Sequence, residues 1–193
     1  MSIEQNITGV AGWHIGEDKV LRFYVTQGVD VEVAQDAADG ALSISVKRLK
    51  AAFATNAKLR FMREGEEGGV VATLSAAAAL GDEILTVAAL ASPLKAASIG
   101  RQVRDISSDT IAYIVSDRPA GAKLINKSGG AITKPDATNG VVDVAIADDD
   151  TVDETTDALK VESGTYYHNL LKTDEGDEQV LVYGMATLLP ATR

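Results

Sequence analysis

The residues best suited to chemistry form an acidic run late in the chain, between positions 148 and 157. Hard cations such as Ca²⁺ prefer several carboxylate oxygens close together, and this run supplies them. It lacks the central glycine and the terminal glutamate of a helix-loop-helix calcium site. We therefore expect a solvated loop, with a weak calcium site or a contact to a basic neighbouring protein as the alternatives. The weak metal candidates are Asp148, Asp149, Asp150 and Asp153, and the candidate contact residues are these four and Glu154.

Other groups that could act chemically are few. The chain has two histidines, His14 and His168, and no cysteine, which removes thiolate metal sites, disulfides and cysteine nucleophiles. Neither histidine belongs to a spaced ligand pattern, so we expect both to be packed or surface residues. No Gly-x-Ser-x-Gly elbow or phosphate-binding P-loop is present. The sequence thus predicts a protein that is not an enzyme and needs no cofactor.

Charge and hydropathy narrow the choice of partners. The net charge of −10 argues against binding nucleic acid, because neutralising phosphates requires a basic face. No apolar run is long enough to span a membrane, and residues 1–6 lack the features of a secretory signal. We expect a soluble protein made in the cytoplasm, without a nucleic-acid or membrane partner. The single tryptophan, Trp13, is expected in the core, with an anchor for a partner as the alternative.

The elements that would position these residues are short strands with alternating apolar side chains, as at 20–25, 42–47 and 141–146. Glycine- and aspartate-rich turns separate them. This pattern predicts an all-β antiparallel sandwich rather than a parallel α/β sheet, which would need recurring amphipathic helices. An α+β fold remains the alternative if 49–56 and 93–97 form longer helices.

The chain closes with two apolar runs, 164–172 and 178–187, on either side of a turn-rich connection. This arrangement predicts a terminal β-hairpin. The second run is almost continuously apolar, so we expect it to be a central strand covered on both faces. Simple alternation would place Val180 and Val182 on one face and Leu181 on the other.

The middle of the chain, residues 70–118, differs from the rest in its many alanines and short aliphatic residues. We expect it to be an insertion or flap of short hairpins, with helical turns at 76–79 and 93–97. Residues 1–69 and 119–193 would then form the sandwich domain.

Several of these segments together resemble a known kind of domain. The chain is similar to the β-sandwich amino-terminal domain of upper baseplate proteins and related neck or fibre-attachment proteins of tailed bacteriophages. The resemblance covers the first and last thirds of the chain. It is carried by 16–18, 21–25, 27–28 and 42–47, and more closely by 140–146, 149–151, 163–167, 180–188 and Pro190.

The resemblance implies a non-enzymatic structural protein of the virion, acting as a head decoration or as a neck or tail accessory. Its expected partners are phage capsid, neck or tail proteins and further copies of itself. The alternative is a carbohydrate- or ligand-binding β-sandwich module, which would present several exposed aromatic residues on one face. The aromatic content of only 5% favours the first class.

Overall fold

The computed structural model describes residues 3–4, 13–62, 69–153, 158–174 and 177–190. The chain folds into two compact units. Unit 1 consists of residues 1–25 and 105–193, and unit 2 of residues 26–104. The alanine-rich segment 70–118 is therefore divided between the units rather than forming one insertion. The chain enters and leaves unit 2 at adjacent points, because Thr26 pairs with Val103.

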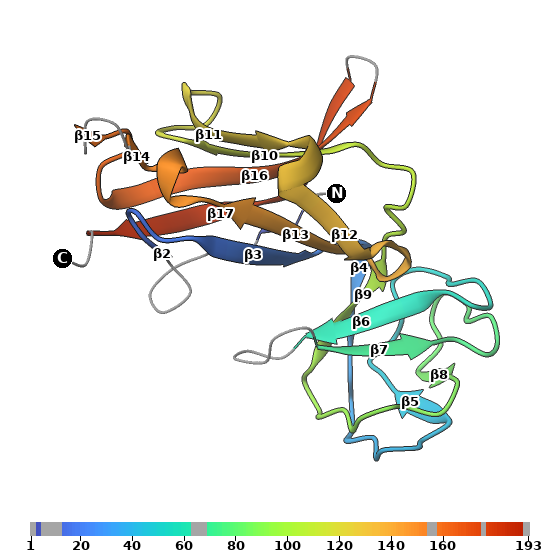
Figure 1. The fold of residues 1–193 in the computed structure, drawn as a ribbon. Helices are drawn as coiled ribbons and strands as arrows, with labels where there is room; N and C mark the ends of the chain where they lie inside the picture. Colours follow the sequence, from blue (N-terminus) through green and yellow to red (C-terminus); the bar gives the residue numbers. More distant parts are fainter. Residues whose placement is uncertain (1–2, 5–12, 63–68, 154–157, 175–176, 191–193) are drawn as a thin grey trace. The chain divides into compact units, whose positions relative to one another are not determined.

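Unit 1 contains a six-stranded sheet that includes the closing hairpin (Figure 1). Neighbouring long strands are antiparallel, and the two shortest strands, β1 and β2, lie parallel to β17. The strand order is β1 (Ile3–Glu4), β17 (Asp177–Leu189), β16 (Gly164–Asp174), β10 (Ile111–Ser116) and β11 (Lys123–Ser128), with β2 (Trp13–His14) also paired to β17.

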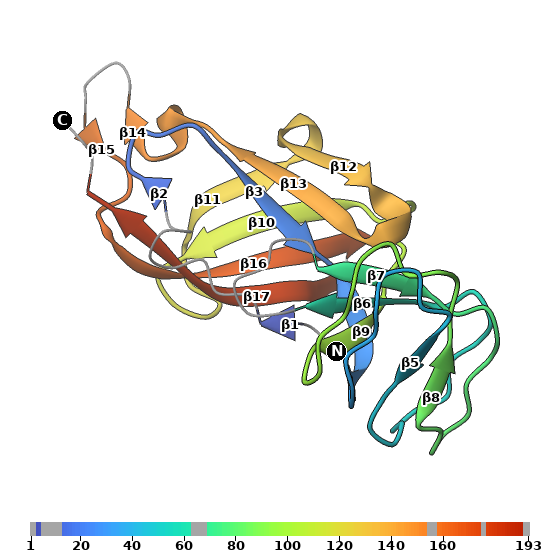
Figure 2. The ribbon, with the colours of Figure 1, turned by 90° about the horizontal axis from the view of Figure 1, so that it is seen from below.

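A second sheet of unit 1 lies over the first (Figure 2). Its order is β12 (Ile132–Asp136), β13 (Val141–Ile146) and β3 (Lys19–Tyr24). Phe23 and Val144 from this sheet pack against Tyr113 and Leu170 from the first, and none of the four has exposed surface. The expected all-β, sandwich-like architecture is confirmed. A two-stranded ladder of β14 (Val152–Asp153) and β15 (Ala158–Leu159) completes the unit.

The predicted terminal hairpin is present, with β16 and β17 paired from Gly164 to Asp174. The simple alternation fails along β17, because the register shifts between Leu170 and Leu171. Leu170 pairs with Val182 and Leu171 with Val180, so Leu181 is the extra residue of a β-bulge. Leu181 and Val182 are consequently both buried, whereas Val180 is exposed.

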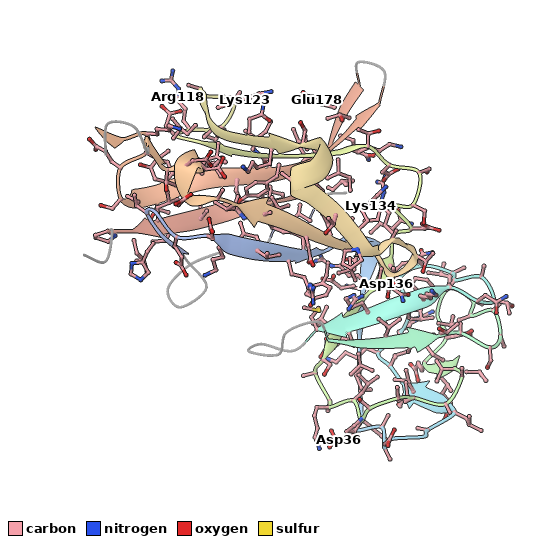
Figure 3. The ribbon with its side chains drawn as sticks, viewed as in Figure 1. Asp36, Arg118, Lys123, Lys134, Asp136 and Glu178 are labelled. Atoms are coloured by element: carbon pink, nitrogen blue, oxygen red, sulfur yellow. The ribbon has the colours of Figure 1, made fainter. Side chains whose placement is uncertain are left out.

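A lysine on β12 holds the turn that leads into β10. Lys134 is labelled in Figure 3. Its Nζ donates hydrogen bonds to the carbonyl oxygens of Ile106, Ser107 and Asp109, at 3.2, 3.0 and 3.0 Å. Carbonyls at a turn have no strand partner, and an ammonium group with three donors can satisfy several of them.

Unit 2 has its own core, surrounded by two sheets. The four-stranded sheet has the order β4 (Thr26–Glu32), β9 (Ile99–Val103), β6 (Lys58–Met62) and β7 (Val70–Thr73). The two-stranded sheet consists of β5 (Ser43–Ser45) and β8 (Ile84–Thr86). Ile44 and Leu85 form its central pair, and both are fully buried.

The two halves of unit 2 repeat one another at a spacing of 41 residues, with two-fold pseudosymmetry. The isolated bridge between Ala37 and Leu94 recurs as the bridge between Ala78 and Phe53, with the same spacing at both ends. The bridge between Val33 and Val46 likewise recurs between Leu74 and Val87. Pairs between β4 and β9, such as Val31 with Gly100, recur between β7 and β6, as Ala72 with Leu59. The β6–β9 and β5–β8 ladders each join one half of the repeat to the other, and the spacing of 41 residues maps each of these ladders onto itself. Unit 2 is therefore an internal duplication.

Backbone conformations repeat at the same spacing. Gly40 and Gly81 have φ values of 75° and 95°, and Asn56 and Ala97 have 66° and 64°. These left-handed backbone conformations favour glycine or asparagine. Ala97 therefore has a strained backbone conformation, which corresponds to that of Asn56 in the first half of the repeat.

The alanine-rich stretches do not form the helical turns expected at 76–79 and 93–97. Ala78 and Leu94 instead make reciprocal backbone hydrogen bonds across the pseudo-dyad, to Phe53 and Ala37 respectively. Each bridge joins an alanine to a larger apolar residue, and the pairing overrides the helix propensity of alanine. Three short 3₁₀ turns, η2 (Gly129–Ala131), η3 (Ala137–Asn139) and η4 (Asp148–Asp150), are the helical elements of the described residues. No described helix has the length and hydropathy needed to cross a membrane.

Candidate functional site

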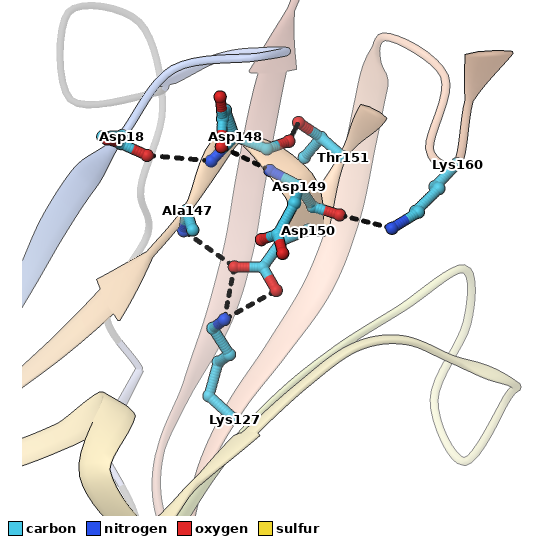
Figure 4. Close-up of polar contacts among 8 residues, drawn as sticks. All are labelled: Asp18, Lys127, Ala147, Asp148, Asp149, Asp150, Thr151 and Lys160. Carbon is cyan, nitrogen blue, oxygen red and sulfur yellow. Dashed lines mark hydrogen bonds and ion pairs between the residues drawn. The ribbon is translucent and has the colours of Figure 1, made fainter. Parts of the chain in front are cut away.

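The acidic run forms a tight turn where β13 ends. Residues 148–150 make the 3₁₀ turn η4, and Asp150 closes it by accepting a hydrogen bond from the Ala147 amide at 2.8 Å (Figure 4). A carboxylate that accepts from a backbone amide three residues earlier satisfies a donor that the turn would otherwise leave unpaired. The local sequence thus uses one of its acidic groups to build the turn itself.

Asp150 also binds a cation from the large sheet. Lys127, on β11, approaches its two carboxylate oxygens at 2.6 and 2.5 Å. The side chains are only 15% and 16% exposed, so this ion pair is largely shielded from solvent. The Asp150 carboxylate is thus engaged by groups of its own unit.

The other residues of the turn have different surroundings (Figure 4). The Asp148 amide donates to Asp18 at 2.9 Å, and the Asp149 amide donates to the Asp148 carboxylate at 2.8 Å. Lys160 Nζ donates to the Asp149 carbonyl at 2.6 Å. Asp149 is the exposed member of the three aspartates. Its carboxylate is therefore the one best placed for a contact outside the chain.

Thr151 joins the turn to the start of β3. Its hydroxyl donates to the Asp148 carbonyl at 3.1 Å and accepts from the Gly16 amide at 2.9 Å. The residue is 1% exposed, and its own carbonyl accepts from the Lys160 amide at 2.8 Å. Residues 148–151 thus form a turn held by hydrogen bonds to other parts of unit 1, which we call the buttressed turn, and Asp149 is its exposed residue; residues 154–157 of the expected solvated loop lie outside the described residues.

The remaining acidic candidates are described only in part. Asp153 lies on β14, but its side chain is outside the described residues, as are Glu154 and Asp157. Among the residues that the structure describes, no three His, Cys, Asp or Glu side chains are grouped so as to hold a metal ion.

The two histidines have structural surroundings. His14 Nδ1 lies 2.8 Å from the Pro190 carbonyl oxygen. His168 is fully buried on β16, with its ring centroid 5.7 Å from that of Phe23 and 5.8 Å from that of Tyr113. His168 is therefore a packed residue, as expected. Trp13 contributes its backbone to β2, while its side chain lies outside the described residues.

Two tyrosines on the outward face of the closing hairpin are exposed. Tyr167 and Tyr183 are 38% and 41% exposed. Tyr167 pairs with Met185 and Tyr183 with Asn169, so the tyrosines are diagonal neighbours, about 7–8 Å apart at Cα. The aromatic content of 5% did not predict an exposed aromatic pair of this kind.

Sequence reasoning identified the acidic turn but not the residues that hold it. Lys127, on β11, and Lys160, directly after β15, reach the turn from elsewhere in the chain, and their spacing in the sequence carries no signal of this. The Gly16 and Asp18 contacts were equally hidden, although both residues precede a predicted strand. No protein-family model matches the chain, and no curated protein is detectably similar to it.

Proposed function

We propose that this protein is a non-enzymatic structural protein of a bacteriophage virion, a head decoration or a neck or tail accessory. It binds capsid, neck or tail proteins and further copies of itself, and its place of action is the assembled particle. No cofactor, nucleic acid or membrane takes part in the proposed function.

One observation supports this proposal above the others. The segments of the closer half of the phage-domain resemblance all belong to unit 1. Residues 141–146 form β13, 149–151 belong to the buttressed turn, and 164–167 pair with 185–188 in the closing hairpin. This half of the resemblance is thus carried by residues that fold together, whereas segments 27–28 and 42–47 of the other half belong to unit 2.

The buttressed turn is the first candidate contact with a partner. A turn held by Lys127, Asp18 and Thr151 is ordered before it binds, so little conformational entropy is lost on association. The chain carries a net charge of −10, which steers it towards basic patches. Many identical sites on a particle make even weak contacts sufficient.

The test is association of the purified protein with phage particles that lack it. We expect saturable binding without added cofactor, and slower association at high ionic strength. Asp149→Asn should slow association without changing stability, because its carboxylate is exposed. Asp39→Asn, which removes another exposed carboxylate, in unit 2, is the matched control.

Two outcomes separate the parts of this proposal. Unchanged association of the Asp149→Asn variant would remove the turn from the interface. Failure to bind any particle, with the protein folded, would refute the virion role.

The exposed tyrosine pair favours carbohydrate binding as a second candidate function. Sugar-binding surfaces use aromatic rings that combine apolar faces with a polar group, and Tyr167 and Tyr183 provide two on neighbouring strands. A glycan array would test this function. Binding that is lost in Tyr167→Ala and Tyr183→Ala but retained in Val20→Ala would support it, and a blank array would count against it.

A further inference from the structure

The duplication in unit 2 allows each residue to be compared with the residue at the equivalent position of the other half. This comparison indicates which side chains the fold requires. Most buried positions are apolar in both halves, as for Ile44 and Leu85, Val46 and Val87, or Leu49 and Leu90, although the buried Phe61 corresponds to Gln102. An exposed apolar residue whose counterpart is polar is a different case, because the fold gains little from its side chain.

Three exposed aliphatic residues break the pseudosymmetry in this way. Leu42, Leu80 and Ile84 are 64%, 68% and 63% exposed. At a spacing of 41 residues their counterparts are Glu83, Asp39 and Ser43. Each position therefore accepts a polar side chain in the same fold, so the apolar residue is dispensable for folding.

The three residues lie on the β5–β8 ladder or within a few residues of its ends. Ile84 opens β8 opposite Ser45, and Leu42 directly precedes β5, where its carbonyl accepts from the Val87 amide at 3.0 Å. Leu80 is next to Gly81, whose amide donates to the Leu49 carbonyl at 3.0 Å. The outward side chains of the ladder, Ser43, Ser45, Ile84 and Thr86, are small or aliphatic, and three of them are exposed. We call this surface, with Leu42 and Leu80, the β5–β8 face.

Local charge indicates what this face can bind. Segments 39–50 and 80–87 carry three basic residues, Lys47, Arg48 and Lys50, against three acidic ones, Asp39, Asp82 and Glu83. The whole chain has a net charge of −10, so two copies repel one another over most of their surface. Residues 26–104 carry equal numbers of basic and acidic residues, so the β5–β8 face belongs to the unit through which two copies can approach with little repulsion.

We infer that the β5–β8 face binds the same face of a second copy of this chain. An isologous contact needs a surface complementary to itself. The surroundings of the ladder meet this condition because they carry three basic and three acidic residues, so groups of opposite charge can face one another across the contact. This inference deepens the proposed function by assigning a surface to self-association.

The test is sedimentation equilibrium of the full chain. We expect a concentration-dependent dimer of the 20.2 kDa chain. The variant Leu42→Glu, Leu80→Asp, Ile84→Ser takes each residue from the other half of the repeat and should be monomeric, with an unchanged circular dichroism spectrum. Ile84→Ser alone, which adds no charge, should raise the dissociation constant about tenfold, equivalent to about 1.4 kcal/mol.

Val20→Ser is the matched control, since Val20 is 60% exposed but belongs to unit 1. It should leave the dissociation constant unchanged. A wild-type chain that is monomeric up to about 100 μM, a weak affinity on the usual scale, would overturn the inference. So would an Ile84→Ser variant that dimerises like wild type. Mass is measured without phage particles, so the virion role and this inference can fail separately.

Discussion

Thr151 and Tyr113 are both buried in unit 1, yet their hydroxyl groups have opposite surroundings. The Thr151 hydroxyl both donates and accepts a hydrogen bond. The Tyr113 hydroxyl is completely buried and has no hydrogen-bond partner in the described part of the chain. A satisfied buried polar group stabilises a fold, whereas an unsatisfied one retains the cost of its desolvation. The two residues should therefore respond differently when the hydroxyl is removed.

Thr151→Val should lower the free energy of unfolding by about 1–3 kcal/mol, because the Gly16 amide loses its acceptor while the side-chain volume is kept. Urea unfolding monitored by fluorescence would measure this. Thr187→Val is the control, since Thr187 lies half-buried on the outward side of β17. Equal stability of the two variants would show that the Thr151 junction contributes nothing.

Tyr113→Phe should be neutral or stabilising at pH 7, because it removes only the unpartnered hydroxyl. Burial raises the pKa of Tyr113 well above its usual value of 10.0. Above about pH 10 the unfolded state loses the Tyr113 proton while the folded state keeps it. The free energy of unfolding of the wild type is therefore unaffected by this group below about pH 10 and declines above it. The decline is about 1.36 kcal/mol per pH unit.

Unfolding free energies measured from pH 8 to 11, the range around the ordinary tyrosine pKa of about 10, would detect this decline as a difference between wild type and Tyr113→Phe. Parallel pH profiles would show that the Tyr113 ring is not buried in solution.

Among the elements, the closing hairpin shows which structural features the sequence pattern can predict and which it cannot. Alternation and turn composition predict β16 and β17, because both are local properties of the chain. The bulge at Leu181 is not local, since it depends on the register between two strands. One extra residue therefore turned Leu181 towards the core and Val180 outward, and the exposure of Val180 and Tyr183 shows that the expectation of a strand covered on both faces was wrong. The same limit applies to the acidic turn, whose residues were predictable while its partner Lys127 was not.

Leu181→Asp should abolish soluble expression, because it removes a 2% exposed leucine and buries a charge in the core of unit 1. The leucine alone is worth about 2–5 kcal/mol, and the carboxylate adds to the cost. Val180→Asp is the adjacent control, since Val180 is 38% exposed and should accept the carboxylate. Yield and melting temperature compare the two. Normal yield of Leu181→Asp would place the bulge outside the core.

At the scale of the whole chain, composition misplaced the boundary between the units. A change in alanine content marked residue 70, but the duplicated unit starts at Thr26. Its first half contains Phe53, Phe61 and many charged residues, which conceal the likeness to the alanine-rich second half. The spacing of buried apolar positions and of Gly40 and Gly81 was the signal that could have revealed the repeat.

Replacing residues 26–104 with a short glycine-serine linker should leave a cooperatively unfolding unit 1, because Thr26 and Val103 are paired neighbours and the gap to close is small. Replacing residues 70–118 should not, because β10 would be lost from between β16 and β11. Calorimetry of the two deletions would compare them. A cooperative transition in the second alone would reverse the assignment of the units.

The duplication has a consequence for the history of the chain. A segment of about 40 residues without disulfides or metal lies at the lower limit for folding alone. Each half of unit 2 also directs its backbone hydrogen bonds to the other half, as at Ala37 with Leu94 and Ala78 with Phe53. A single ancestral copy could satisfy those groups only by pairing with an identical molecule. Gene duplication and fusion would then have converted a small homodimer into one continuous domain, freeing each half to change its surface independently.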